Sequence, residues 1–207
     1  NASNNSVKVI NTTAADLKGA TATATVYNLD GSEATVYART ATVDVPASNR
    51  AEAFVLPFPA IGDGFKQAQG LTPFHFIRLK LTDAKGKLLS ENFYWRNGEK
   101  ELDYTPLNTL PEAPLKCTLL QKTTGGRFLL RLENPSTTVS FANRIRLVNA
   151  ATGERVLPII FSDNYITLLP GEERELVIEA EPALLKGGVK VLLKQYGYPE
   201  REGLDVL

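Results

Sequence analysis

The 207-residue sequence has no methionine, only one histidine and only one cysteine. His75 and Cys117 cannot by themselves supply the set of nitrogen and sulfur ligands that a zinc site needs. A single cysteine also cannot close an intrachain disulfide, so the fold must be stabilised by packing alone. The missing methionine leads us to expect either a processed protein or a piece of a longer one.

Excess charge and long apolar runs are lacking as well. Lys and Arg number 23 and Asp and Glu number 23, so the net charge is zero and no nucleic-acid partner is expected. No run approaches the roughly 18 apolar residues of a membrane-spanning helix, and no signal-peptide pattern opens the chain. We therefore expect no membrane partner. A composition that is 43% hydrophobic and 22% charged is typical of one or two packed domains.

Alternation of apolar and polar residues is the dominant pattern that is present. Residues 20–27 set alanines and Val26 on one face against threonines on the other, which is typical of a half-buried strand. Residues 74–81 and 88–95 flank an Asp-Ala-Lys-Gly turn and predict a hairpin. Further strands are expected at residues 51–58, 115–122, 127–133, 142–149, 156–162, 173–180 and 189–196.

Three segments depart from this alternation. Residues 33–45 are extended, but their apolar phase slips near residues 39–41, which predicts a bulge or a strand that changes sheets. Residues 97–114 are first polar and then punctuated by prolines, so they predict a domain boundary. Residues 181–186 are the only candidate for a short helix.

Short strands with regular turns in both halves predict an all-β fold of two tandem immunoglobulin-like antiparallel β-sandwiches. We expect the first sandwich at residues 1–102, a Pro-rich connector at 103–114 and the second sandwich at 115–207. Neither half carries the Cys…Trp…Cys signature of immunoglobulin domains, because Cys117 stands alone and Trp95 closes a strand.

Few residues are candidates for catalysis. His75 is the only imidazole, and it is in phase with Ile77 and Leu79 on the apolar face of its strand, which favours a packed histidine over a catalytic base. Cys117 is interpreted as a small buried hydrophobe. Acidic residues fall on solvent faces or in turns, so no pocket with two paired carboxylates is expected. We predict no catalytic residue, no metal ligand and no cofactor site.

Aromatic residues are the remaining candidates for a binding surface. Tyr94 and Trp95 end a strand, and Tyr94 is out of phase with its neighbours, so at least one ring is expected at the surface or at a domain boundary. Core or interdomain packing is one interpretation, and stacking on a glycan is the other. Asn4 and Asn11 head glycosylation sequons, which matter only in a eukaryotic secretory setting.

Three groups of segments, taken in order, resemble the C-terminal part of glycoside hydrolase family 2 enzymes of the exo-β-D-glucosaminidase and β-mannosidase type. They are Phe76–Asp83 with Ser90–Trp95, then Asp103–Pro111, then Thr152–Pro158 with Phe161–Tyr165 and Leu168–Glu172. Any one of them is a weak signal, but three in sequence are strong. The connector Asp103–Pro111 favours the glucosaminidase branch.

The resemblance implies a long retaining enzyme in which two immunoglobulin-like domains follow a catalytic barrel. This chain is similar to that final pair, and both catalytic glutamates lie in the absent barrel, so no catalytic residue carries over. The partners implied are the barrel and other domains of the parent chain, which is expected to be periplasmic or secreted. Ser162, Asp163, Asn164 and Tyr165 either form a turn that caps a strand end or reach toward the barrel and help to form its rim.

Two alternatives to an accessory domain pair remain open at this point. The aromatic cluster and the sandwich fold are also compatible with an autonomous carbohydrate-binding or adhesion module. A pair of sandwiches like that of a pilus chaperone is a third possibility, but it predicts a basic cleft. The charge neutrality of both halves favours the first two.

Overall fold

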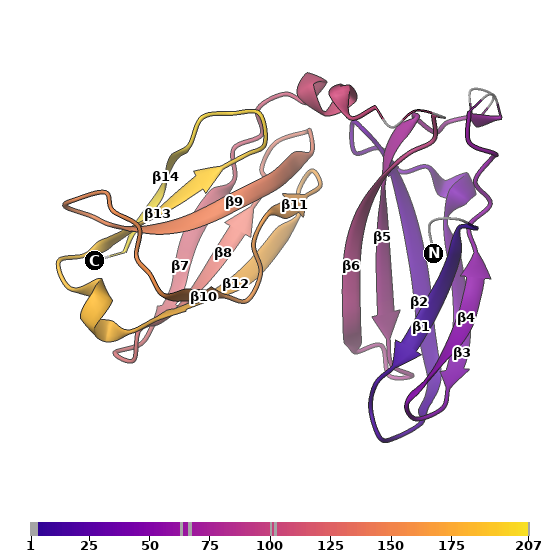
Figure 1. The fold of residues 1–207 in the computed structure, drawn as a ribbon, viewed down its shortest axis with the longest axis horizontal. Helices are drawn as coiled ribbons and strands as arrows, with labels where there is room; N and C mark the ends of the chain where they lie inside the picture. Colours follow the sequence, from indigo (N-terminus) through magenta and orange to yellow (C-terminus); the bar gives the residue numbers. More distant parts are fainter. Residues whose placement is uncertain (1–3, 63, 66–67, 100, 102, 207) are drawn as a thin grey trace. The chain divides into compact units, whose positions relative to one another are not determined.

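The computed structural model describes residues 4–62, 64, 65, 68–99, 101 and 103–206. It divides into two compact units, Asn1–Leu107 and Asn108–Leu207, and the division falls inside the expected connector. Figure 1 shows that each unit is built from strands. The prediction of an all-β fold is confirmed, since the described residues contain strands and short 3-10 turns but no α-helix. The helix candidate at 181–186 is one such turn, Pro182–Leu185.

The first unit sets a two-stranded sheet against a four-stranded one. The small sheet pairs β1 (Ser6–Asn11) with β4 (Asn49–Val55). All neighbours in both sheets are antiparallel. The large sheet has the order β3 (Arg39–Val45), β2 (Leu17–Asn28), β5 (Phe74–Thr82), β6 (Leu88–Asn97).

The alternation in β2 sets the core of this unit. Ala20, Ala22 and Ala24 are buried with Val26, as their shared phase predicts. Ala20 and Ala22 pack with Val9 and the valines of β3. Ala24 and Val26 pack with aromatic residues from the loops, including Phe65. Because alanines offer little volume, these larger side chains fill the space between the sheets.

The expected bulge near residues 39–41 is wrong. A 3-10 turn at Thr35–Tyr37 precedes β3, and β3 then pairs regularly with β2 from Ala24↔Arg39 to Ala20↔Val43. The turn buries Tyr37, whose ring centroid lies 5.8 Å from that of Phe58. The phase slip in the sequence therefore marks a buried ring entering from a turn, not an irregular strand.

The second unit packs two four-stranded antiparallel sheets. One has the order β10 (Ile159–Phe161), β12 (Glu173–Ala180), β8 (Arg127–Glu133), β7 (Lys116–Lys122). The other has the order β11 (Ile166–Leu168), β9 (Ser140–Asn149), β13 (Val189–Lys194), β14 (Arg201–Val206). Inward residues of both sheets form one core, including Phe128, Leu130 and Leu132. The pattern did not predict β1, β11 or β14.

An asparagine holds the end of a strand in each unit. Asn11 donates its side-chain amide to the carbonyl oxygens of Ala15 (2.8 Å) and Val45 (3.2 Å). Its Oδ1 accepts from the backbone N–H and the hydroxyl of Thr13 at 3.1 and 2.8 Å. The hydroxyl residue of this sequon is thus a partner of the buried asparagine, and the amide nitrogen is fully used inside the protein.

Asn134 repeats this arrangement in the second unit. Its amide donates to the carbonyl oxygens of Thr138 (2.8 Å) and Leu168 (3.0 Å), and its Oδ1 accepts from the N–H and hydroxyl of Ser136. The partners stand two, four and 34 residues along the chain, the same separations as for Asn11. We refer to these two side chains as the asparagine clamps.

Candidate functional site

His75 is a packed side chain. Its Nδ1 lies 3.0 Å from the carbonyl oxygen of Pro73, and its ring stands between Phe58 and Phe65, at 5.0 and 5.4 Å between centroids. The side chain is 1% exposed. Burial lowers the pKa of His75 to about 4, which keeps the imidazole neutral at physiological pH. No described serine or cysteine is hydrogen-bonded to it, so it has no nucleophile to activate.

The other groups that could carry chemistry are also in structural roles. Burial raises the pKa of Cys117 to about 11, so the thiol stays protonated and unreactive. Backbone N–H groups of Lys87 and Lys85 lower the pKa of Asp83, which caps a hairpin turn. Among the described residues, no three His, Cys, Asp or Glu side chains gather as a metal site would require.

The strand glutamates of the second unit lie on its surface, as their phase predicts. Arg131 contacts Glu175 at 3.1 Å and Glu173 at 3.7 Å, and Lys116 contacts Glu133 at 2.8 Å. All of these side chains are partly or largely exposed, so the pairs contribute little to stability. They form no pocket in which a carboxyl could be held as an acid.

Three of the four residues in the loop 162–165 are fixed by neighbouring strands. Asn164 accepts from the N–H of Ile145 at 2.8 Å and donates to its carbonyl oxygen at 3.0 Å, so its amide occupies the place of a strand neighbour to β9. Asp163 accepts from Arg174 at 2.9 Å, and the hydroxyl of Ser162 accepts from the N–H of Val177 at 2.9 Å. These contacts agree with the interpretation of residues 162–164 as a strand-end turn.

Tyr165 is the member of this loop that points outward. Its side chain is 65% exposed, while its backbone has φ 55°, a left-handed conformation that costs a tyrosine about 1 kcal/mol. The N–H of Tyr165 donates to Asn164 Oδ1 at 2.8 Å, which holds that conformation. Leu157 and Ile160, earlier in the same segment, are also exposed. The segment thus presents large apolar side chains to solvent from a fixed backbone.

Tyr94 and Trp95 lie on opposite faces of β6. They are 46% and 49% exposed, and their register partners are Ile77 and Phe76, which face opposite sides of β5. Successive strand residues point to opposite faces, so the two rings cannot form one stacking platform. Trp95 shares its face with Phe93, whose ring centroid lies 5.4 Å from that of Phe76.

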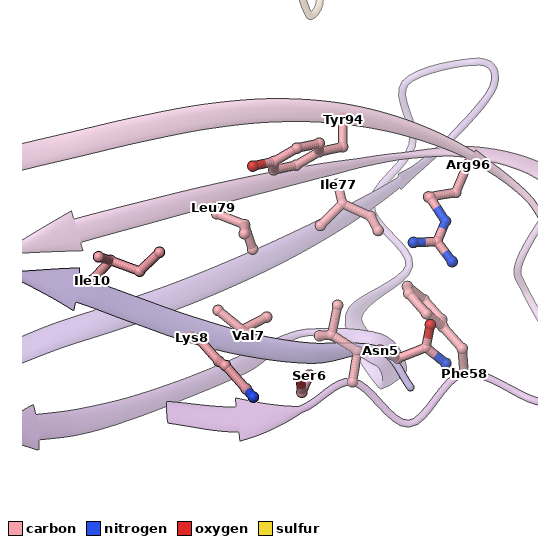
Figure 2. Close-up of a pocket in the computed structure, with 11 residues that line it drawn as sticks. Asn5, Ser6, Val7, Lys8, Ile10, Phe58, Ile77, Leu79, Tyr94 and Arg96 are labelled. Atoms are coloured by element: carbon pink, nitrogen blue, oxygen red, sulfur yellow. The ribbon is translucent and has the colours of Figure 1, made fainter. Parts of the chain in front are cut away.

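Tyr94 lines a groove of about 460 Å³ on the open side of the first sandwich. Figure 2 shows Ile77 and Leu79 projecting from β5 toward Val7 on β1, with Tyr94 above them. The groove is also lined by Asn5, Ser6, Lys8, Ile10, Leu56, Phe58 and Arg96. A second hollow of about 270 Å³ shares the residues Val7, Leu79 and Tyr94, so the two form a continuous surface. This groove could not be predicted from the sequence, because β1, which forms one wall, was not predicted.

Comparisons with known proteins place both units in named families. The exo-β-D-glucosaminidase Ig-fold domain family matches residues 92–196, and the mannosidase Ig/CBM-like domain family matches residues 3–100. The chain therefore belongs to the family of immunoglobulin-like domains found in exo-β-D-glucosaminidases, and the resemblance found in the sequence is confirmed.

Curated relatives agree with this assignment. The chain is 31% identical to the exo-β-D-glucosaminidase of Amycolatopsis orientalis over 89% of its own length, and 31% identical to that of Streptomyces avermitilis over 88%. The aligned regions make up only 19% and 22% of those two proteins. The chain thus spans about a fifth of the length of these relatives.

Solved structures share the fold as well. The crystal structure of the Amycolatopsis orientalis exo-chitosanase CsxA is 28% identical and has a TM-score of 0.76 over 96% of this chain, which is 25% of that protein. A β-D-mannosidase from Dictyoglomus thermophilum, with 14% identity and a TM-score of 0.54, shares the fold alone. Within the described residues, no helix has the length and apolarity needed to cross a membrane.

Proposed function

We propose that this chain is the non-catalytic C-terminal domain pair of a retaining exo-β-glucosaminidase of glycoside hydrolase family 2. The observation that carries this proposal is that the matched families cover the two halves in succession. A neutral buried His75, a protonated Cys117 and surface-paired glutamates support a chain without chemistry of its own. The parent is then a periplasmic or secreted hydrolase.

The role we assign to the pair is to support the catalytic barrel, with residues 162–165 as the contact. The turn is hydrogen-bonded to β9 through Asn164 and to Arg174 through Asp163, so Tyr165 loses little backbone freedom on docking. An exposed aromatic on a fixed backbone is the kind of residue that dominates binding energy at interfaces.

Kinetics of the parent enzyme test this role. Replacing Tyr165 with alanine is expected to lower kcat/KM on glucosamine oligomers about tenfold, equivalent to loss of one interface anchor. The matched control is Tyr196→Ala, because Tyr196 is a half-exposed tyrosine of the same unit. Equal kinetics for both variants would contradict the contact. The 207-residue chain itself should release no glucosamine, and turnover abolished by a local carboxylate mutation would refute the accessory role.

Tyr94 favours a second candidate function, a carbohydrate-binding module. Its half-exposed ring lines the groove with Asn5, Lys8 and Arg96 close by, a combination of stacking surface and polar groups that sugars use. The two cations disfavour protonated glucosamine, so a neutral mannose oligomer is the better ligand. Titration calorimetry with mannose and glucosamine oligomers tests this function. Micromolar binding that is lost in Tyr94→Ala and kept in Trp95→Ala would support a carbohydrate-binding module. Absence of binding would contradict it.

A further inference from the structure

The first sandwich is open on one side. Its small sheet consists of β1 and β4 alone, while the large sheet facing it has four strands and ends in β6. Among the strands that the structure describes, β6 pairs only with β5 and β1 pairs only with β4. Both free edges border the groove, whose walls come from β1 and β6 and whose floor is Ile77 and Leu79.

The edge strand β6 has few of the features that keep edges from pairing. It runs for ten residues without proline or lysine, and its pairing with β5 is regular from Asn97 to Ser90. Its charged members are Glu91, which contacts the buried Arg78 at 3.3 Å on the face away from the groove, and Arg96 near its end. By comparison, the edge of β1 has a register shift at Val7/Lys8.

The groove beside this edge suits the side chains of an added strand. Most of its lining is apolar, from Val7, Ile77, Leu79 and Tyr94, and it lies directly along the inner face of β6. A strand placed next to β6 would point every second side chain to the same side of the sheet as Tyr94, at the mouth of the groove. Lys8 and Arg96 are the charged groups of the lining, so an acidic residue in the added strand would be favoured.

We propose that an extended segment from the rest of the parent polypeptide adds to β6 as a fifth strand, closing the mouth of the groove with apolar side chains and placing a carboxylate near Arg96. Such a segment is available because the chain spans only 19% and 22% of the two full-length relatives. Strand addition combines main-chain hydrogen bonds to the free edge with burial of the groove. The proposal rests on the existence of the parent enzyme that is proposed above.

Amide hydrogen exchange along residues 88–97 tests strand addition directly. We expect the amides on the free edge of β6 to exchange at least tenfold more slowly in the parent enzyme than in the 207-residue chain. Amides of β8, which is paired on both sides, serve as the internal reference. Equal exchange of β6 in the two proteins, with β8 unchanged, would overturn the proposal.

A pair of adjacent substitutions adds specificity to this test. In the parent, Tyr94→Lys should return β6 exchange to the rate of the short chain, because it places a charge in the groove. Trp95→Lys, equally exposed but on the other face, should retain the protection. Loss of protection with both variants, or with neither, argues against a strand seated in the groove. Thermal unfolding of both variants in the 207-residue chain establishes that each folds.

Other occupants give different results in the same measurement. Protection of β6 in the short chain that rises with protein concentration identifies a second copy, and protection by an added mannose oligomer identifies a glycan. Either result without the parent-dependent effect overturns the proposal. Activity of the parent on glucosamine oligomers is measured separately. The proposed function can therefore fail while β6 is protected, and β6 can lack protection in a parent that is active.

Discussion

Single side chains that satisfy several backbone groups at once hold the ends of the strands in both units. Each asparagine clamp is buried and joins the end of one strand to the last residue of another strand, 34 residues away. Asn11-Thr12-Thr13 has the pattern of a glycosylation sequon, yet here the hydroxyl of Thr13 donates to the asparagine itself. Asn134-Pro135-Ser136 makes the same contacts although its proline excludes it as a sequon. The same short pattern thus has a structural cause that local sequence cannot distinguish from a modification site.

Removal of either clamp should destabilise its unit. Asn11→Ala and Asn134→Ala each leave buried carbonyl oxygens unpaired, for which we expect a loss of about 2 to 4 kcal/mol in the free energy of unfolding. Urea denaturation of the 207-residue chain measures the loss. Asn92→Ala, at an exposed position on β6, is the control and should change stability by less than about 0.5 kcal/mol.

His75 should make the first unit sensitive to mild acid. Its folded-state pKa of about 4 lies below the ordinary value of 6.5, so the unfolded chain takes up the proton first. Stability is therefore unaffected above pH 6.5, falls as the pH drops from 6.5 to 4 and levels off below that. The total loss is about 3 kcal/mol.

Replacing His75 with phenylalanine is the test of this pH dependence. Denaturation between pH 4 and 7 should show a clear decrease in stability for the wild-type chain and a nearly flat profile for His75→Phe. Turn carboxylates such as Asp83 have lowered pKa values, so they are ionised in both states over most of this window. A decrease that persists in the variant would exclude His75 as its cause.

At the level of the elements, turn backbones explain where glycine is required. Gly126 closes the turn between β7 and β8 with φ 80°, and a Cβ there would collide with the carbonyl oxygen of Ala180. Gly153 has a similar φ of 72°, but no heavy atom lies within 4 Å of the position of its missing Cβ. A side chain at Gly153 would therefore meet only the strain of the left-handed backbone, whereas a side chain at Gly126 would also collide with Ala180.

This contrast predicts unequal effects of alanine. Gly153→Ala should cost about 1 kcal/mol for its left-handed backbone, while Gly126→Ala should cost about 2 to 4 kcal/mol because Ala180 must also move. Chemical denaturation compares the two. Equal losses in the free energy of unfolding would mean that the hairpin can shift away from Ala180 at no measurable cost.

At the level of the whole molecule, each unit has a core of its own. The core of the second unit consists entirely of residues from 115 onward, and the clusters of the first unit end before residue 82. Chains cut between Leu107 and Asn108 should therefore each fold and unfold cooperatively. Circular dichroism during heating checks this, and an unfolded half would show that its stability depends on the other.

The sequence by itself determined the class and the order of this fold. Period-two alternation fixes which residues of a strand face the core, so the inner face of β2 and the hairpin of β5 and β6 could be predicted from residues alone. The resemblance of three segment groups indicates the family from the sequence alone.

Only the tertiary structure decided which edges stay free and which surfaces come together. Alternation places Tyr94 and Trp95 on opposite faces, but the groove beside Tyr94 exists because β1, which precedes Tyr94 by 83 residues or more, faces β5 across the sandwich. The clamps and the outward Tyr165 likewise depend on contacts between distant segments. Local patterns set the face of each residue, whereas strand pairing over long separations depends on the packing of the whole unit.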